Sequence, residues 1–333
     1  MTTAIVAIFV FGLLVFFHEL GHFAVAKFVG IKVYEFAIGM GPKVVHISKA
    51  ETLYSIRALP IGGFVRMEGE DEESSTENSF SQKTVKERIS VILAGPLMNF
   101  ILGFLCFFLI FLSIGVPSTQ ISEVVKDSPA YNAGIQSDDR VQQIQGNQIT
   151  SWEQLVDKIT TSEGEVMVLE VIRNDEKLYF EVVPEIDVNT GRAMIGIIPG
   201  SEISFSGALV NSYHQTIFIF TEILNFLQQL IRGQADTANV AGPVGIISLV
   251  GEASRSGWID VVGLAGLISI NLGIMNLLPI PALDGSRIIF LLLEGIRGKP
   301  INPEKEALVH MIGITLLMML MIMITYKDIL MFF

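Results

Sequence analysis

This sequence has a single cysteine and no concentration of positive charge. Its one cysteine, Cys106, cannot form a disulfide within the chain, and it lies in the apolar run FLCFFLIF, which predicts an inert buried thiol. The formal net charge is -12, and no stretch is rich in Lys and Arg. Because binding to phosphates needs a basic surface, the sequence argues against a nucleic-acid partner.

Charged residues are also scarce in four long apolar runs. Hydrophobic residues make up 50% of the 333 positions, which is more than a soluble domain of this size usually buries. About 20 apolar residues are enough to cross a bilayer. No basic segment precedes the first run, so we interpret it as a retained spanning helix and not a cleaved signal peptide. The predicted transmembrane helices are residues 1–30, 89–115, 259–296 and 307–326.

The first connection, residues 31–88, combines a strand pattern with an acidic loop. The stretch LYSIRALPIGGFVRM alternates as a strand does, with interruptions at Pro60, Gly62 and Gly63. This pattern predicts a β-hairpin associated with the membrane. Residues 68–78, EGEDEESSTEN, have no apolar period, and we interpret them as a mobile loop.

Residues 118–186 change to short strands and turns. They contain QISEVV, a helical WEQLVDKITT, and the strands VMVLEVIR and KLYFEVV. The segment DSPAYNAGIQSDDRVQQIQGNQI resembles the circularly permuted PDZ domains of bacterial envelope proteases. An inserted α+β PDZ-like domain is therefore predicted. Residues 187–258 would form a linker with an amphipathic interfacial helix at 208–231 and a GPVGI loop.

The pentad HELGH in the first apolar run has the spacing of a metal site. His18 and His22 are four residues apart, so a helix presents both imidazoles on one face to one zinc ion. Glu19 follows the first histidine directly. In zinc hydrolases, a glutamate at this position takes a proton from the attacking water and passes it to the leaving amine. Burying these three side chains in a spanning helix costs a few kcal/mol each, which favours a functional role over a structural one.

A third ligand is predicted in the interrupted third run. A catalytic zinc takes three protein ligands and leaves one position open. Pro279 and Pro281 break the helix in INLGIMNLLPIPALDGSR, and Asp284 lies at this break in an otherwise uncharged apolar stretch. Broken backbone at membrane depth survives where protein or a water-filled cavity satisfies it, and hydrolysis needs such a cavity. Capping of the restarted helix is the alternative role for Asp284, and the two roles are compatible.

Several motifs together resemble one family. HELGH, GPLMN at 95–99, the PDZ-like insert, AGPVGI at 241–246 and NLLPIPALDG at 276–285 follow in the order of the bacterial site-2 proteases, in their single-PDZ form. The resemblance implies a polytopic α-helical membrane protein of the plasma membrane. It also implies a zinc-dependent endopeptidase that cuts transmembrane segments of single-span proteins, either anti-sigma factors or remnant signal peptides.

The resemblance also implies roles for individual residues. Zn²⁺ would be held by His18, His22 and Asp284, with Glu19 as the catalytic acid and base. Two asparagines would hold the extended substrate or its oxyanion near the metal, and a GGF edge would pair with the substrate as an added strand. These substrate-binding residues are Asn271, Asn276, Gly62, Gly63 and Phe64.

Lys and Arg predict the orientation, because they mark the cytoplasmic side of a membrane protein. Nine of them lie between Lys27 and Arg88, whereas residues 1–26 have none. The first connection is therefore expected in the cytoplasm and the PDZ-like domain outside the cell membrane.

Two other classes of function stay open at this point. One is a membrane-anchored PDZ scaffold with a structural metal site, and the other is a metal transporter whose His and Asp residues line a path. The remaining histidines, His46, His214 and His310, are expected to be solvated or hydrogen-bonded and not to bind the metal.

Overall fold

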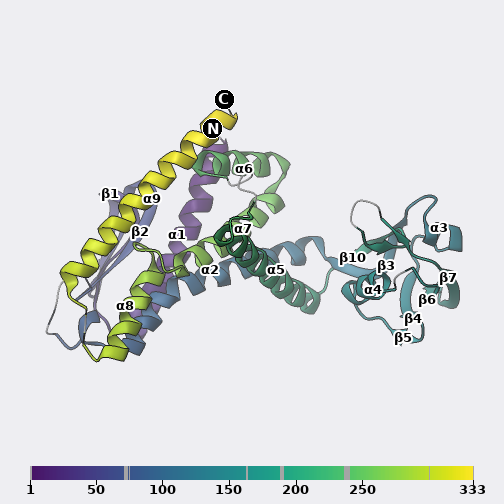
Figure 1. Ribbon diagram of the computed structural model, residues 1–333, viewed down its shortest axis with the longest axis horizontal. Coiled ribbons are helices and arrows are strands. Elements are labelled where there is room, and N and C mark those ends of the chain that lie inside the picture. The colour runs from purple at the N-terminus through teal and green to yellow at the C-terminus, as the bar shows by residue number, and fades with distance from the viewer. Residues whose placement is uncertain are drawn as a thin grey trace. The chain divides into compact units, whose positions relative to one another are not determined.

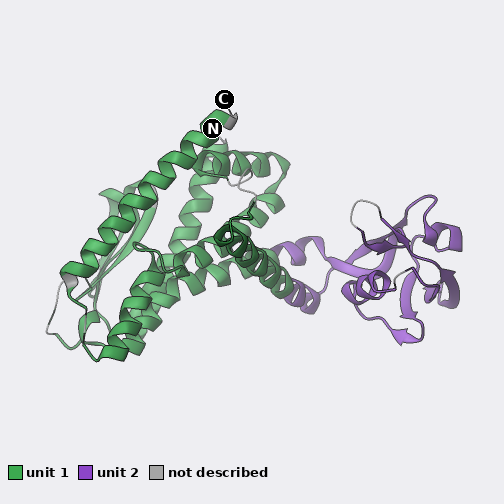
Figure 2. Ribbon diagram, viewed as in Figure 1, with its two compact units in different colours: residues 1–107, 212–333 green, residues 108–211 purple. Residues whose placement is uncertain are grey.

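The chain folds into two compact units. Figure 1 shows it as a computed structural model. The first comprises residues 1–107 and 212–333, and the second comprises residues 108–211 (Figure 2). The acidic segment predicted as a loop at 68–78 lies partly outside the described residues. The structure describes residues 2–70, 74, 76–162, 164–187, 191–235, 241–299 and 301–332.

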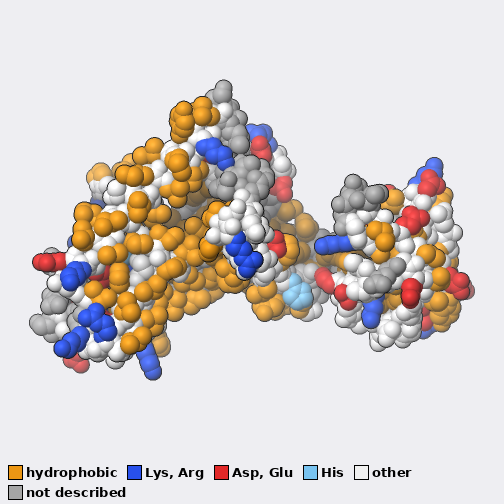
Figure 3. Space-filling model, viewed as in Figure 1, with side chains coloured by type: hydrophobic (Ala, Val, Ile, Leu, Met, Phe, Trp, Pro, Cys, Tyr) orange, Lys and Arg blue, Asp and Glu red, His pale blue; other side chains and the backbone are white. Residues whose placement is uncertain are grey.

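Four helices among these described residues are long and apolar enough to cross a membrane. They are α1 (Thr2–Phe28), α2 (Val85–Ile114), α7 (Trp258–Leu277) and α9 (Pro303–Phe332). At most 33% of the most apolar stretch of each helix is buried within the protein, and hydrophobic side chains dominate the face of the first unit in Figure 3. Such a surface needs lipid around it. The four predicted membrane helices are confirmed.

A long β-hairpin follows α1. Its strands β1 (Val33–Lys49) and β2 (Thr52–Met67) pair antiparallel, and β2 flanks β1 twice, since Ala37 pairs with both Ser55 and Phe64. The proline and glycines of β2 bend this strand without ending it. A buried carboxylate joins β1 to the first half of β2, because Glu35 accepts hydrogen bonds from Ser55 Oγ at 2.6 Å and Arg57 Nη2 at 2.7 Å. A short 3-10 helix, η1 (Phe80–Gln82), leads into α2.

The third apolar run, residues 259–296, folds as two helices, with the interruption at the prolines where the sequence predicts it. α7 ends at Leu277, and residues 278–283 separate it from α8 (Asp284–Arg297). Of the two, only α7 has the length and apolarity of a span within the described residues. A Cβ on Gly285 would collide with the backbone oxygens of Leu277 and Leu278, so this glycine lets the restarted helix lie against the end of α7. Asp284 is thereby the first residue of α8.

Two helices follow β-strand residues of the second unit in the chain and precede α7: α5 (Phe205–Ile231), whose first residues belong to the second unit, and α6 (Pro243–Ser256). α5 is not among the helices that qualify as spans in the described residues, as the interfacial prediction requires. The GPVGI motif starts α6, and the buried Asp328 of α9 accepts hydrogen bonds from the backbone N–H groups of Gly242 at 3.1 Å and Gly245 at 2.8 Å. A carboxylate at a helix N-terminus satisfies its free donors, so this motif docks the last helix.

The second unit is an α+β domain around a six-stranded sheet of order β10-β3-β4-β6-β7, with β5 paired to β4. Its core contains Ile121, Leu155 and Leu169, all fully buried. The domain boundary expected at residue 186 falls inside this unit, because β10 pairs with β3, a partner distant in sequence. Its elements are β3 (Val116–Val124), α3 (Pro129–Ala133), β4 (Arg140–Ile144), β5 (Asn147–Gln148), α4 (Trp152–Thr160), β6 (Met167–Arg173), β7 (Glu176–Val182), β8 (Glu185–Ile186), β9 (Ala193–Met194) and β10 (Ile197–Glu202).

Candidate metal centre

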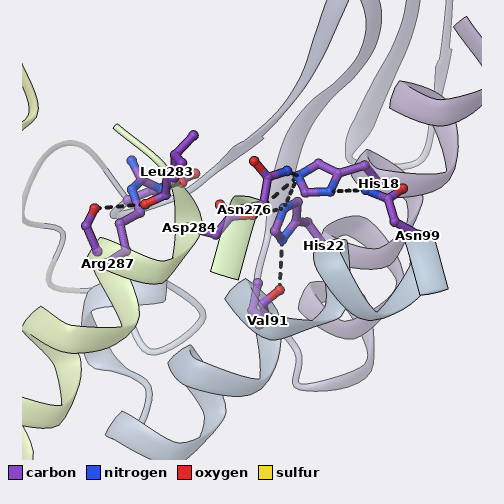
Figure 4. Close-up of polar contacts among 10 residues, drawn as sticks. His18, His22, Val91, Asn99, Asn276, Leu283, Asp284 and Arg287 are labelled. Atoms are coloured by element: carbon purple, nitrogen blue, oxygen red, sulfur yellow. Dashed lines mark hydrogen bonds and ion pairs between the residues drawn. The ribbon is translucent and has the colours of Figure 1, made fainter. Parts of the chain in front are cut away.

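Two histidines of α1 and one carboxylate of α8 meet inside the first unit (Figure 4). The Nε2 atoms of His18 and His22 lie 3.2 Å apart. Asp284 Oδ2 lies 3.3 Å from His18 Nε2 and 3.5 Å from His22 Nε2. Among the described residues, these three form the group of potential metal ligands whose ligand atoms come together. Their side chains are only 12 to 20% exposed.

The spacing of the three atoms fits a tetrahedral zinc ion. Zinc binds imidazole nitrogen and carboxylate oxygen at about 2.0–2.1 Å, so two ligand atoms of one tetrahedron lie about 3.3–3.4 Å apart. The three separations of 3.2, 3.3 and 3.5 Å agree with this value. Asp284 Oδ2 is buried and has no hydrogen-bond partner within the described part of the chain. A cation at the centre of the triangle would satisfy it.

Helix α2 supplies the partners that orient both imidazoles. His22 Nδ1 donates to the Val91 carbonyl at 2.9 Å, which leaves the Nε2 lone pair for the metal. The Asn99 side-chain amide lies 3.2 Å from His18 Nδ1. Asn99 Oδ1 has no partner among the described residues, and turning the amide would let Oδ1 accept the Nδ1 proton. His18 Nε2 would then also be free to bind a metal.

Close helix packing makes room for this arrangement. A Cβ on Gly21 would overlap the Ala94 carbonyl, so α1 and α2 touch along their backbones at this level. A Cβ on Gly95 would overlap the His22 ring and lie 2.9 Å from His18 Cε1. Gly95 therefore leaves space for the imidazoles. Ser269 of α7 donates to the Asn99 carbonyl at 2.7 Å and joins the third helix to the same place.

Glu19 lies beside the three ligands without belonging to their group. It is near enough to His18, His22 and Asp284 for electrostatic interaction. Its stem faces the hairpin, since a Cβ on Gly63 would lie 3.0 Å from Glu19 Cγ. The edge of β2 thus passes directly next to the expected catalytic carboxylate.

The other predicted substrate-binding residues differ in their distance from the centre. Asn276 Nδ2 lies 3.4 Å from His18 Nε2, at the ligand group itself, whereas Asn271 is exposed one and a half turns earlier on α7. Gly62 has a φ of 75°, the left-handed region that glycine tolerates. The Phe64 ring stacks with Arg57, whose guanidinium carbon is 4.8 Å from the ring centroid.

The sequence reasoning missed three contributors. The sequence contains a signal for Asn99, because a lone amide in an apolar run indicates a specific polar contact. His310 left the same kind of signal, and its Nδ1 accepts the Ala282 N–H at 3.0 Å, in the loop before Asp284. The Val91 carbonyl left none, since any residue supplies a backbone oxygen.

Comparisons with known proteins show the family of the chain. The sequence profile described as peptidase family M50 matches residues 6–320. Zinc metalloprotease RasP of Bacillus licheniformis is 36% identical, with 99% of each chain covered. Regulator of sigma-W protease RasP of Bacillus subtilis is 34% identical, over 99% of this chain and 98% of its own. The PDZ domain of an SdrC-like protein from Listeria monocytogenes is 22% identical, with a TM-score of 0.23, and covers 26% of this chain and 90% of its own.

We predict that Gly95→Ala weakens zinc binding by about 10-fold or more, because the new methyl group displaces the His22 imidazole. The measurement is the zinc dissociation constant of detergent-purified protein in competition with a chelator. Gly12→Ala on α1 is the matched control, since a Cβ there meets nothing within 4 Å. Equal zinc affinity in both variants would contradict the proposed packing of the centre.

Proposed function

The chain belongs to peptidase family M50, and from this premise we propose that it cuts peptide bonds within the membrane at a zinc ion held by His18, His22 and Asp284. The family and the relatives confirm the predicted zinc metalloprotease activity and the zinc cofactor. The multi-pass membrane character is confirmed by the four apolar helices. The assignment of roles to residues is our proposal.

One observation carries the assignment. The three ligand atoms are 3.2 to 3.5 Å apart, although Asp284 follows the two histidines by more than 260 positions in sequence. A structural zinc site is closed by four protein ligands, whereas a catalytic site keeps one position open. Three ligands with an adjacent glutamate that is not a ligand support hydrolysis over a structural metal site.

Each residue of the site has a separate role in the proposed hydrolysis. When bound, zinc activates water and polarises the scissile carbonyl. Glu19 takes the proton of the attacking water and returns it to the leaving nitrogen. The β2 edge at Gly63 pairs with a locally unwound substrate and holds it extended beside Glu19. Asn276, next to His18 Nε2, donates its amide hydrogens to the oxyanion that develops on the scissile carbonyl.

The substrates that fit such a buried site are single-span membrane proteins. A helix conceals its peptide carbonyls, so segments with helix-weakening residues unwind more easily and are preferred. We propose membrane anti-sigma factors as the first class to examine, because one relative carries the name regulator of sigma-W protease. Remnant signal peptides are the second class.

We predict that Glu19→Gln retains zinc but loses at least about 100-fold in cleavage rate. Gln preserves the shape of the side chain, yet it does not carry a proton between water and the leaving nitrogen. Zinc content and cleavage of a tagged single-span substrate are measured on the same detergent-purified sample. Glu181→Gln, the same replacement at an exposed glutamate of β7 in the second unit, serves as the control. Wild-type cleavage by the Gln variant would exclude the proposed role.

The distribution of Lys and Arg supports a cytoplasmic first connection and an external PDZ-like domain. In a Cys106→Ala background, we predict that a membrane-impermeant maleimide applied to intact cells labels Asn147→Cys but not Gln82→Cys. Both positions are exposed in the structure, and Asn147 lies in the second unit. Permeabilised cells control for reactivity. Labelling of both variants in intact cells would refute this orientation.

A further inference from the structure

We propose that His310 of α9 is a positioning residue that fixes the loop carrying the metal ligand Asp284. This inference rests on the proposed role of Asp284. The loop of residues 278–283 joins α7 to α8 and ends directly at the ligand. His310 Nδ1 accepts a hydrogen bond of 3.0 Å from the backbone N–H of Ala282, two residues before Asp284.

The loop needs such support because its backbone is unusual at Ala282. This residue has a φ of 82°, in the left-handed region that favours glycine and is disfavoured for alanine by its Cβ. A conformation of this kind persists only where its surroundings determine it. His310 provides the acceptor for the Ala282 N–H.

The imidazole itself is held in place. Its side chain is 18% exposed, and its ring packs edge-on against Phe290 of α8, with 5.7 Å between the ring centroids. A peptide N–H only donates, so Nδ1 must carry a lone pair and the ring proton must reside on Nε2. Glu306 Oε1 lies 3.8 Å from Nε2, one helical turn earlier on α9. Ring packing and the hydrogen bond therefore select one orientation of His310.

A second contact between α9 and the loop is independent of the hydrogen bond. Gly313 lies three residues after His310, on the same face of α9. A Cβ on Gly313 would overlap the Cβ and carbonyl of Pro281. The backbone of α9 therefore touches the loop next to Ala282. Since α9 is otherwise little buried, with 6% of its most apolar stretch covered, these contacts give it a specific position beside the ligand loop.

The expected consequence is on metal affinity. Without an acceptor at Nδ1, the Ala282 peptide relaxes toward a more favourable φ and turns the start of α8. The Asp284 carboxylate then loses its alignment with the two imidazoles. Removal of outer partners of metal ligands typically reduces affinity 10- to 100-fold, and an indirect effect through the backbone is expected near 10-fold.

Three variants of His310 separate this role from general packing. Leucine removes the acceptor, asparagine places an amide oxygen where Nδ1 stood, and glutamine places one where Nε2 stood. We expect His310→Leu and His310→Gln to weaken zinc binding about 10-fold, and His310→Asn to recover most of the loss. The zinc dissociation constant is measured by chelator competition on the full-length protein in detergent, together with thermal unfolding.

His214→Leu is the matched control, because it makes the same replacement at an exposed histidine of α5. Asp284→Asn tests the premise separately. If Asp284→Asn leaves zinc affinity unchanged, the proposed ligand set fails. If Asp284→Asn weakens it while all three His310 variants bind as the wild type does, only the positioning role is overturned. Equal losses in the Asn and Gln variants would also overturn it, and this comparison stands even if the Leu variant does not fold.

Discussion

The cost of polar groups in an apolar solvent is the constraint on which this structure depends. Two imidazoles, two carboxylates and a broken helix end lie where lipid would leave them unsatisfied. The structure solves this by directing the groups at one another: Asp284, His18 and His22 form a triangle of ligand atoms, and Val91 and Asn99 occupy the opposite nitrogens of the two rings. The metal ion that we propose at this site would complete the arrangement, because three facing acceptors without a cation repel one another.

The helices around the site are shaped by that requirement. Gly21 and Gly95 let α1 and α2 approach until their backbones touch, a packing mode suited to lipid, where small residues replace the hydrophobic effect as the source of helix association. The break between α7 and α8 turns a spanning segment into a ligand-bearing loop, and α9 contacts it through His310 and Gly313. Asp328 anchors the far end of α9 to the start of α6. The catalytic geometry thus depends on helices that supply no ligand.

Sequence reasoning reached the spans, the hairpin, the inserted domain and the three side chains that the structure brings together as potential ligands. These features leave local signals: apolar length, the i, i+4 spacing of His18 and His22, and an aspartate at a helix break. It did not reach features set by contacts between distant segments. β10 extends the sheet beyond residue 186 by pairing with β3, and Gly95 faces imidazoles carried by another helix. His310 was expected only to be solvated or hydrogen-bonded, because no pattern near it in the sequence indicates Ala282 as its partner. The interruption predicted at Pro279 and Pro281 is a local signal of the same kind, and the structure has it there, between the end of α7 and the start of α8.

The zinc coordination shell gives the most direct measurement of the central claim. X-ray absorption at the zinc edge of the detergent-purified protein should show nitrogen and oxygen ligands only, at about 2.0–2.1 Å, with the multiple scattering of two imidazoles. Asp284→Asn should alter the oxygen contribution and leave the two imidazoles in place. A sulfur ligand at about 2.3 Å, or a count of imidazoles other than two, would contradict a centre built from His18, His22 and Asp284.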